Sequence, residues 1–162
     1  MNAYPSITGV IQAVNSLQDT SAGNLCSFLL DLQTAGGPVS LLLTANTYVM
    51  GCQPLNPGDT ITAFYDPDAP MVLIYPPRYT ALAVAKTGDG LQAVLDSFSQ
   101  DLVNSDGTLQ LNPDQNTQIR TPNGQRVMAI PGDSFLMVLY SETTRSIPAI
   151  TVPKEITVFC RG

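Results

Sequence analysis

The sequence predicts an all-β protein made of two tandem copies of one short strand-rich unit. Thirteen prolines and twelve glycines in 162 residues favour many short strands separated by turns over helices. Hydrophobic residues make up 44% of the chain and charged residues 12%, a composition that can bury a core and that argues against intrinsic disorder. The third observation is an internal repeat.

The repeat becomes visible when the chain is aligned with itself. Residues 27–47 align without a gap on residues 97–117, with identical residues at eight of the 21 positions. Further along, Pro57-Gly58-Asp59 corresponds to Pro131-Gly132-Asp133, and an apolar stretch follows each. We therefore predict two related units, residues 1–86 and 87–162. Because the connection between them is short and has apolar residues on both sides, we expect the units to pack as one compact body.

The strands are predicted from β-branched, aromatic or alternating segments that Gly, Pro, Asn or Asp separate. In the first unit these segments are residues 7–14, 26–32, 39–43, 60–65, 71–75 and 79–84. In the second unit they are residues 109–111, 118–120, 135–140 and 156–159.

One segment of the second unit is ambiguous. Leu91, Val94, Leu95, Phe98 and Leu102 fall at helical spacing, which on its own indicates a helix. The repeat, however, matches residues 97–102 to a predicted strand of the first unit. We therefore favour a strand here and keep the helix as the alternative.

The order of the predicted elements in the first unit resembles the OB-fold. A long strand is followed by a hairpin, a connection over residues 47–55, the turn at Pro57-Gly58-Asp59 and further strands, and the connection lies where many OB-folds place a helix. Strands of this number and length suit a small closed or partly closed barrel, because closure removes exposed edges. The expectation is two small OB-like β-barrel units.

Three short runs carry a second resemblance. They are Ala63-Phe64-Tyr65-Asp66, the run from Leu73 to Tyr79, and the run from Tyr140 to Pro148. These runs resemble a family of bacterial proteins that carry paired OB-like units and have no characterised activity. The resemblance implies the paired fold and implies no activity, cofactor or site residue.

The residues available for catalysis are few. The chain contains no histidine, which excludes His-dependent triads, Cys-His dyads and the usual general base at neutral pH. Asp59 and Asp133 recur after Pro-Gly, where a turn aspartate bonding backbone amides is expected. Asp31 and Asp101 also recur, and paired acids in two related units would be the starting point of an acid dyad, although a structural role is favoured.

Two short acidic runs place oxygen atoms at alternate positions, as calcium loops do. They are Asp66-Pro-Asp68 and Asn112-Pro-Asp114-Gln-Asn116. Both lack the glycine and the terminal glutamate of an EF-hand loop, and ordinary Asx-turns account for them. We predict no metal, no cofactor and no catalytic residue.

The three cysteines, Cys26, Cys52 and Cys160, are too far apart in sequence to form a C-x-x-C motif, and an odd number does not give a disulfide framework. They are interpreted as buried small hydrophobic residues in a reducing compartment. A bridge between one pair, such as Cys26 and Cys52, stays open if the chain is exported.

The candidate binding residues are Tyr75, Arg78 and Tyr79. They flank a stiff Pro-Pro pair, and tyrosine and arginine are enriched at the anchor points of protein interfaces. The alternative is a rigid connection whose tyrosines pack on the rim of the barrel.

Charge and hydropathy limit the partners. Seven basic residues face thirteen acidic ones, for a net charge of −6, and such a field repels nucleic acid and anionic membranes. The first residues have neither a cationic start nor an apolar run, and no segment approaches the length needed to span a bilayer. A cytoplasmic chain is expected, with a domain excised from an exported protein as the alternative.

The sequence therefore favours a non-catalytic binding or assembly module that engages a protein, peptide or glycan partner. The alternative function is an enzyme that uses carboxylates, with or without a divalent metal, at the junction of the two units.

Overall fold

The computed structural model describes residues 3–17, 26–71 and 73–160. Every regular element in this part of the chain is a β-strand, which confirms the all-β prediction. No helix among the described residues is long and apolar enough to cross a membrane. The chain divides into two compact units, the N-terminal unit Pro5–Gly88 and the C-terminal unit, which runs from Asp89 onward and also includes Ala3 and Tyr4.

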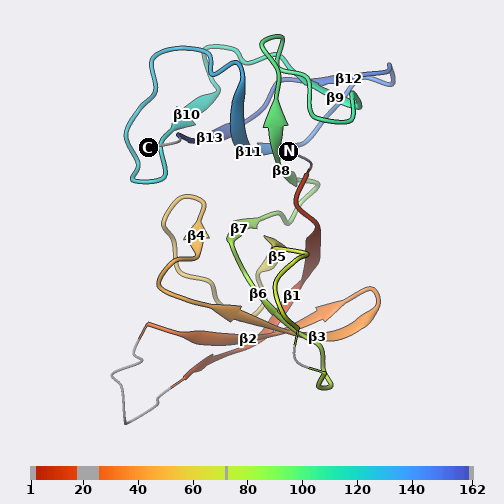
Figure 1. Cartoon of the computed structure of the whole chain (residues 1–162), viewed down its shortest axis with the longest axis vertical. Coiled ribbons are helices and arrows are strands. Elements are labelled where there is room, and N and C mark those ends of the chain that lie inside the picture. Colours follow the sequence, from red (N-terminus) through yellow and green to blue (C-terminus); the bar gives the residue numbers. More distant parts are fainter. Residues whose placement is uncertain (1–2, 18–25, 72, 161–162) are drawn as a thin grey trace. The chain divides into compact units, whose positions relative to one another are not determined.

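The described residues of the N-terminal unit form seven strands in one sheet (Figure 1). They are β1 (Ser6–Ser16), β2 (Phe28–Thr34), β3 (Gly37–Leu43), β4 (Tyr48–Val49), β5 (Thr60–Phe64), β6 (Arg78–Thr80) and β7 (Ala83–Lys86). Their order in the sheet is β4-β7-β5-β1-β2-β3-β6. β6 runs parallel to β3 and β4 runs parallel to β7. The other neighbours are antiparallel.

Two residues, Ala81 and Leu82, separate β6 from β7. The N–H of Ala81 donates to Leu42 O at 2.9 Å and the N–H of Leu82 donates to Phe64 O at 2.7 Å. One run of chain thus bonds to β3 near one end of the sheet and to β5 near the other.

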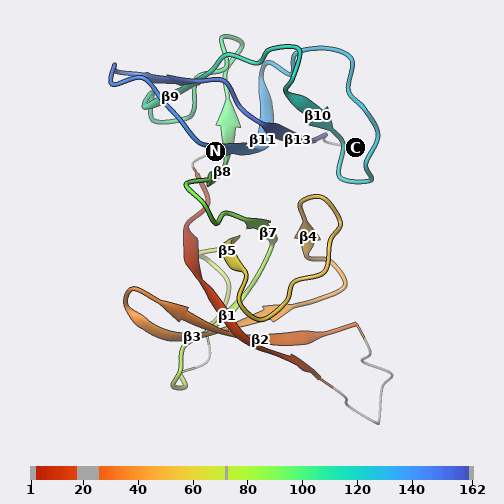
Figure 2. The ribbon, with the colours of Figure 1, turned by 180° about the vertical axis from the view of Figure 1, so that it is seen from behind.

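The C-terminal unit contains six strands in two sheets (Figure 2). They are β8 (Gln92–Phe98), β9 (Leu109–Leu111), β10 (Gln118–Arg120), β11 (Ser134–Tyr140), β12 (Ala149–Thr151) and β13 (Glu155–Phe159). One sheet has the order β10-β13-β11-β8 and the other pairs β12 with β9. β10 is parallel to β13, and β12 is parallel to β9.

Each unit has its own cluster of buried apolar side chains. In β2, Leu30 and Leu32 are buried while Asp31 and Gln33 are exposed, the alternation expected when one face of a sheet covers a core. The N-terminal cluster also includes Ile11, Leu41, Ile61, Ala63, Ala81 and Val84. The C-terminal cluster consists of Phe98, Leu102, Leu109, Leu111, Leu136, Val138, Ile156 and Val158.

Gly9 determines where β1 meets β2. The two strands pair from Gly9 opposite Thr34 onward, and a Cβ atom at Gly9 would lie 2.8 Å from Gln33 O. Only glycine permits this close approach of the two backbones. The preceding residues of β1, Ser6 to Thr8, pair with β5.

The ambiguous segment is a strand as far as Phe98. The chain then turns, with the N–H of Leu102 donating to Ser99 O at 2.9 Å and Leu102 in the left-handed region at φ 60°. The prediction of a strand was therefore right for residues 92–98 and wrong for the residues that follow. The aligned residues of the first unit form β2, so the aligned segments differ at their start.

Two predicted strands differ from the structure, and two short strands were not predicted. Residues 71 and 73–75 form no strand, because the flanking Pro70, Pro76 and Pro77 supply no N–H groups for a ladder. The predicted strand over residues 79–84 is interrupted at Ala81–Leu82 and divides into β6 and β7. The short strands β4 and β12 carry too few residues to show a pattern in the sequence.

The prediction of buried cysteines is wrong. Cys26, Cys52 and Cys160 are exposed free thiols. Cys26 precedes β2, Cys160 follows β13, and Cys52 lies in a turn with φ 48°. All three occupy positions outside the strands, where the alternation that buries a side chain does not operate.

The expectation that the units unfold together can be tested with one buried leucine from each cluster. Leu30 and Leu136 are both fully buried, so Leu30→Ala and Leu136→Ala should each cost about 2–5 kcal/mol. In calorimetry of the full chain, both variants should lower one shared transition. Leu73→Ala, at a fully exposed side chain, should leave it unchanged. Two transitions, each moved by one variant alone, would show independent units.

Candidate functional site

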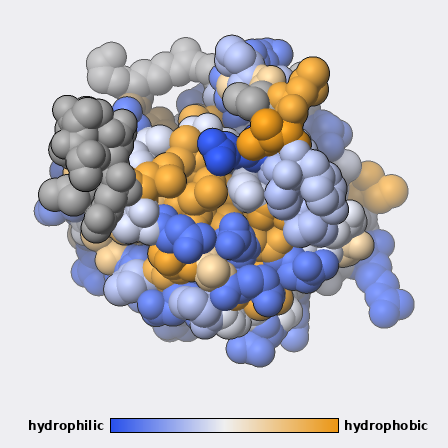
Figure 3. Space-filling view, turned by 90° about the horizontal axis from the view of Figure 1, so that it is seen from below, coloured by the Kyte–Doolittle hydropathy of each residue, from blue (hydrophilic) through white to orange (hydrophobic). Residues whose placement is uncertain are grey.

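The loop between β5 and β6 exposes an unusual amount of apolar surface. Leu73 is 100% exposed, Tyr75 81%, Met71 51% and Ile74 44%. Exposed apolar residues are common singly, but several in one short segment indicate an interaction site. Figure 3 shows the N-terminal unit from the side of β2 and β3, with apolar side chains gathered among hydrophilic ones on this face.

A groove of about 430 Å³ lies beside this loop within the N-terminal unit. We call it the Tyr75 groove. Its lining includes Ile7, Thr8, Val39, Tyr75, Pro77 and Tyr79. These residues come from β1, from β3 and from residues 75–79, which lead into β6 and include its second residue. Thr34, Ala35 and Gly36 from the turn between β2 and β3 also line the groove.

The structure brings two of the three predicted binding residues together. Tyr75 and Tyr79 both line the Tyr75 groove. Tyr79 lies opposite the buried Leu41, and its ring is 4.7 Å from that of Tyr65, so packing fixes its position. Arg78 is exposed and lies opposite Ser40. Because side chains alternate along a strand, Arg78 projects from the other face of the sheet.

A second groove, of about 370 Å³, lies in the C-terminal unit. We call it the Ala3 groove. Its lining includes Ala3, Val94, Asp96, Asn104, Asp106 and Tyr140. The pKa of Asp106 is lowered, mainly by the hydrogen bond from the Thr108 hydroxyl. Burial raises the pKa of Tyr140.

The chain itself supplies part of the Ala3 groove. Ala3 is one of its lining residues, and the N–H of the next residue, Tyr4, donates to Leu95 O on β8 at 3.0 Å. The Tyr4 ring meets the Phe135 ring edge-on at 5.5 Å.

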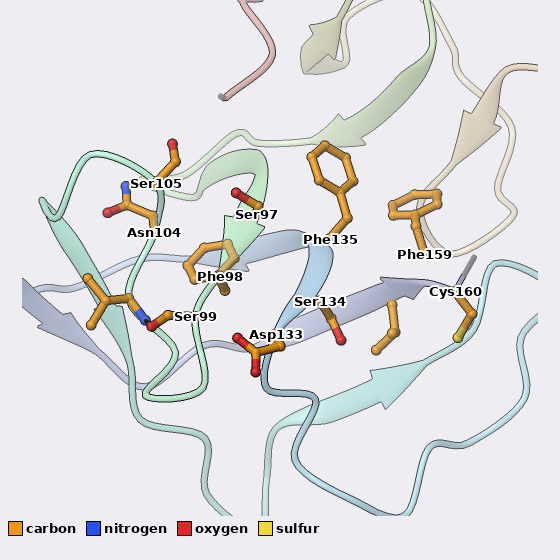
Figure 4. Close-up of a pocket in the computed structure, with 12 residues that line it drawn as sticks. Ser97, Phe98, Ser99, Asn104, Ser105, Asp133, Ser134, Phe135, Phe159 and Cys160 are labelled. Carbon is orange, nitrogen blue, oxygen red and sulfur yellow. Dashed lines mark hydrogen bonds between the residues drawn. The ribbon is translucent and has the colours of Figure 1, made fainter. Parts of the chain in front are cut away.

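A larger pocket, of about 740 Å³, lies on the C-terminal unit (Figure 4). Phe135 and Phe159 stand next to each other in it, with ring centroids 6.4 Å apart. Two of its serines are engaged within the protein. The Ser105 hydroxyl donates to Asp96 at 2.9 Å and the Ser134 hydroxyl donates to Gly132 O at 3.1 Å.

Three of the acids singled out in the sequence accept hydrogen bonds from backbone N–H groups in turns. Asp59 accepts the N–H of Asn56 at 2.8 Å and pairs with Lys86 at 3.1 Å. Asp66 accepts the N–H of Asp68 at 2.9 Å and Asp114 accepts that of Asn116 at 2.8 Å, as in Asx-turns. Asp133 adopts φ 52° just before β11.

Two further acids, Asp31 and Asp101, are exposed, and Asp31 accepts a hydrogen bond from Asn15 Nδ2 at 3.3 Å. Across the described residues, no group of three or more His, Cys, Asp or Glu side chains is placed to hold a metal ion.

No protein-family model, no curated protein and no solved structure matches this chain. Inference about its function therefore rests on the fold and on the side chains described above.

The ion pair of Asp59 predicts a pH dependence of stability. The N–H of Asn56 and then Lys86 lower the pKa of Asp59, so the ionised carboxylate stabilises the folded state above about pH 4 and this contribution is lost as pH falls through the lowered pKa. Asp59→Asn should therefore lower the melting temperature at pH 7 and have little effect near pH 2.

Asp101→Asn is the matched control for this pH series, because the Asp101 side chain is exposed. It should not change the melting temperature at either pH. An equal effect of Asp59→Asn at pH 7 and near pH 2 would show that the ion pair does not contribute.

Proposed function

We propose that this chain is a non-catalytic binding module that takes a peptide segment of a protein partner in the Tyr75 groove. The observation that carries the proposal is the exposure of Leu73 and Tyr75, with Met71 and Ile74, directly beside a groove that Tyr79 lines. Burying such apolar surface against a partner would contribute about 25 cal/mol per Å² before the costs of association are subtracted.

The chemistry of the groove favours a peptide over a glycan. Val39, Pro77 and the two tyrosines present apolar and aromatic surface, and tyrosine anchors are characteristic of protein interfaces. Pro76 and Pro77 restrict the backbone between the tyrosines, so less conformational entropy is lost on binding. A glycan site would need several side chains free to bond hydroxyl groups, and the polar groups here are mainly the hydroxyls of Ser6, Thr8 and Thr34.

We further propose that both units are copies of one OB-like design. The pairing of strands supports this proposal. β1 pairs antiparallel with β5, and β5 with β7; β8 pairs antiparallel with β11, and β11 with β13. The parallel pairs β3–β6 and β4–β7 have counterparts in β9–β12 and β10–β13. A chain segment bonded to both ends of a sheet is what a partly closed barrel requires.

A matching side-chain contact also supports the repeat. The Thr47 hydroxyl donates to Ala81 O, and the Thr117 hydroxyl donates to Pro153 O, both at 2.7 Å. Thr47 and Thr117 end the aligned segments of the sequence, and each begins the approach to the parallel strand β4 or β10. Membership of the bacterial family of paired OB-like proteins is part of the same proposal.

Peptide selection tests the proposed function. A phage-displayed library of random dodecamers is selected on the full chain, and the enriched peptide is synthesised and titrated by fluorescence anisotropy. Tyr75→Ala should weaken its binding about tenfold or more, as truncation of an interface anchor does.

Ile147→Ala is the control for this titration, because Ile147 is equally prominent at 93% exposure and lies in the C-terminal unit. It should leave the affinity unchanged. Failure to enrich any peptide, or equal effects of Tyr75→Ala and Ile147→Ala, would contradict the proposed function.

The charge balance predicts negligible affinity for single-stranded DNA. Because the net charge is −6, few phosphate counterions can be released on binding. Polarisation titration with a labelled oligonucleotide at physiological salt should show no saturable binding. A sub-micromolar complex that weakens with added salt would contradict the charge argument.

A further inference from the structure

The chain after β10 folds back along that strand as a tight hairpin. Val127 N–H donates to Ile119 O at 2.9 Å. Nearer the turn, Thr121 N–H donates to Gln125 O at 2.8 Å. Gly124 in the turn adopts φ 87°, a conformation that glycine takes without strain. Ile119 and Val127 pack against the C-terminal cluster of buried apolar side chains, so one face of the hairpin is fixed on the core.

Arg120 and Arg126 stand opposite each other on the other face of this hairpin. They form an antiparallel bridge, and one of the two hydrogen bonds above lies on each side of it. Theirs is therefore a non-hydrogen-bonded pair, in which facing side chains are closest. Because side chains alternate along a strand, both arginines project away from the face that Ile119 and Val127 bury. Two of the seven basic residues of the chain thus lie side by side.

A pocket of about 610 Å³ lies beside the two arginines. We call it the Arg120 pocket. Among the described residues that line it, only Arg120 and Arg126 carry a charge, and the others come from residues 115–119 and 127–128. Met128 is 86% exposed and gives the pocket an apolar rim. In a chain with a net charge of −6, this local positive field attracts an anion that carries some apolar surface.

Arg120 is held in place and partly neutralised. Its Nη1 lies 3.6 Å from Glu155 Oε1, and its Nη2 donates to Gln118 Oε1. Arg126 has no such partner, since no carboxylate in the described part of the chain lies within ion-pair distance of it. Two positive charges and one negative charge leave this group with an excess of one positive charge. A singly charged anion balances it and relieves the repulsion between two like charges that face each other.

We propose that the Arg120 pocket binds a carboxylate group. A guanidinium presents paired N–H donors that match the two oxygens of a carboxylate. Arg126 supplies this bidentate contact, and Arg120, held by Glu155, supplies the second positive charge. Met128 contacts the carbon chain of the ligand. A phosphate dianion would bring a second negative charge close to Glu155, so a carboxylate is favoured.

This site is independent of the proposed function. The residues of the Arg120 pocket belong to the C-terminal unit, and those of the Tyr75 groove belong to the N-terminal unit. Loss of one site therefore leaves the other to be measured in the same chain.

Titration with butyrate tests the carboxylate site. Butyrate combines one carboxylate with a short apolar chain, and sodium chloride keeps the ionic strength constant so that general screening does not change. In NMR spectra of the isotopically labelled full chain, the Nε–Hε resonances of Arg120 and Arg126 should shift saturably. The uncharged analogue butyramide should cause no shift, and inorganic phosphate should bind more weakly than butyrate.

Variants of Arg126 provide the second arm. Arg126→Ala should weaken butyrate binding about tenfold or more, because a bidentate charged contact is lost. Arg126→Lys keeps the charge without the planar fork and should recover only part of the affinity. Arg145→Ala is the matched control, since Arg145 is exposed, lies in the same unit and does not line the pocket. It changes the net charge equally and should leave the affinity unchanged. Melting temperatures establish that the variants are folded.

A peptide separates the two sources of a carboxylate. The probe is a capped pentapeptide with a central glutamate flanked by leucines, compared with its glutamine counterpart. Tighter binding of the glutamate peptide than of butyrate supports a site for an acidic segment of a protein. Weaker binding supports a site for a small organic acid. Equal losses in Arg126→Ala and Arg145→Ala, equal shifts with butyramide, or tighter binding of phosphate would overturn the carboxylate site and leave the proposed function unaffected.

Discussion

The sheet of the N-terminal unit depends on one short run of chain that hydrogen-bonds to strands on both of its sides. In the N-terminal unit this run contains Ala81 and Leu82, whose N–H groups reach Leu42 O and Phe64 O. Together with β6 and β7 on either side, this run covers the edges of β3 and β5, and uncovered strand edges are prone to intermolecular pairing. The same run carries Tyr79 against the buried Leu41. The chain segment that hydrogen-bonds to β3 and β5 therefore also positions Tyr79, which lines the Tyr75 groove.

Local pattern predicted most of the strands but not the groove. Residues 109–111 and 118–120 form strands with the predicted bounds, because alternation and flanking turn residues are local properties. Tyr75 and Tyr79 could be selected because they flank two prolines. Thr8 and Val39, which line the same groove, lie inside ordinary strand patterns, and only the pairing of distant strands brings them there. Arg78 was selected by proximity in sequence, and strand alternation places it on the other face.

The sequence alignment of residues 27–47 with residues 97–117 agrees with the structure only in its second half. Thr47 and Thr117 make matching contacts, whereas Phe28 begins β2 and Phe98 ends β8. The turn before β5 has positive φ at Gly58, and the turn before β11 has it at Asp133. When the two turns are aligned through their paired strands, Asp133 corresponds to Gly58. The sequence alignment of the two Pro-Gly-Asp runs instead matches Gly58 with Gly132, one residue earlier. The two turns thus share a positive φ at different residue types.

The missing side chain at Gly9 makes the first strand of the N-terminal unit meet the following segment differently from β8. Glycine lets β2 approach β1 from residue 9 onward, next to the turn that joins β2 to β3. Asp96 on β8 is buried and held by Ser105, and there the first bridge to the following segment forms only at Phe98 opposite Asn104. The place at which each first strand begins to pair with the next segment thus depends on a short stretch that has a glycine in one unit and a hydrogen-bonded carboxylate in the other.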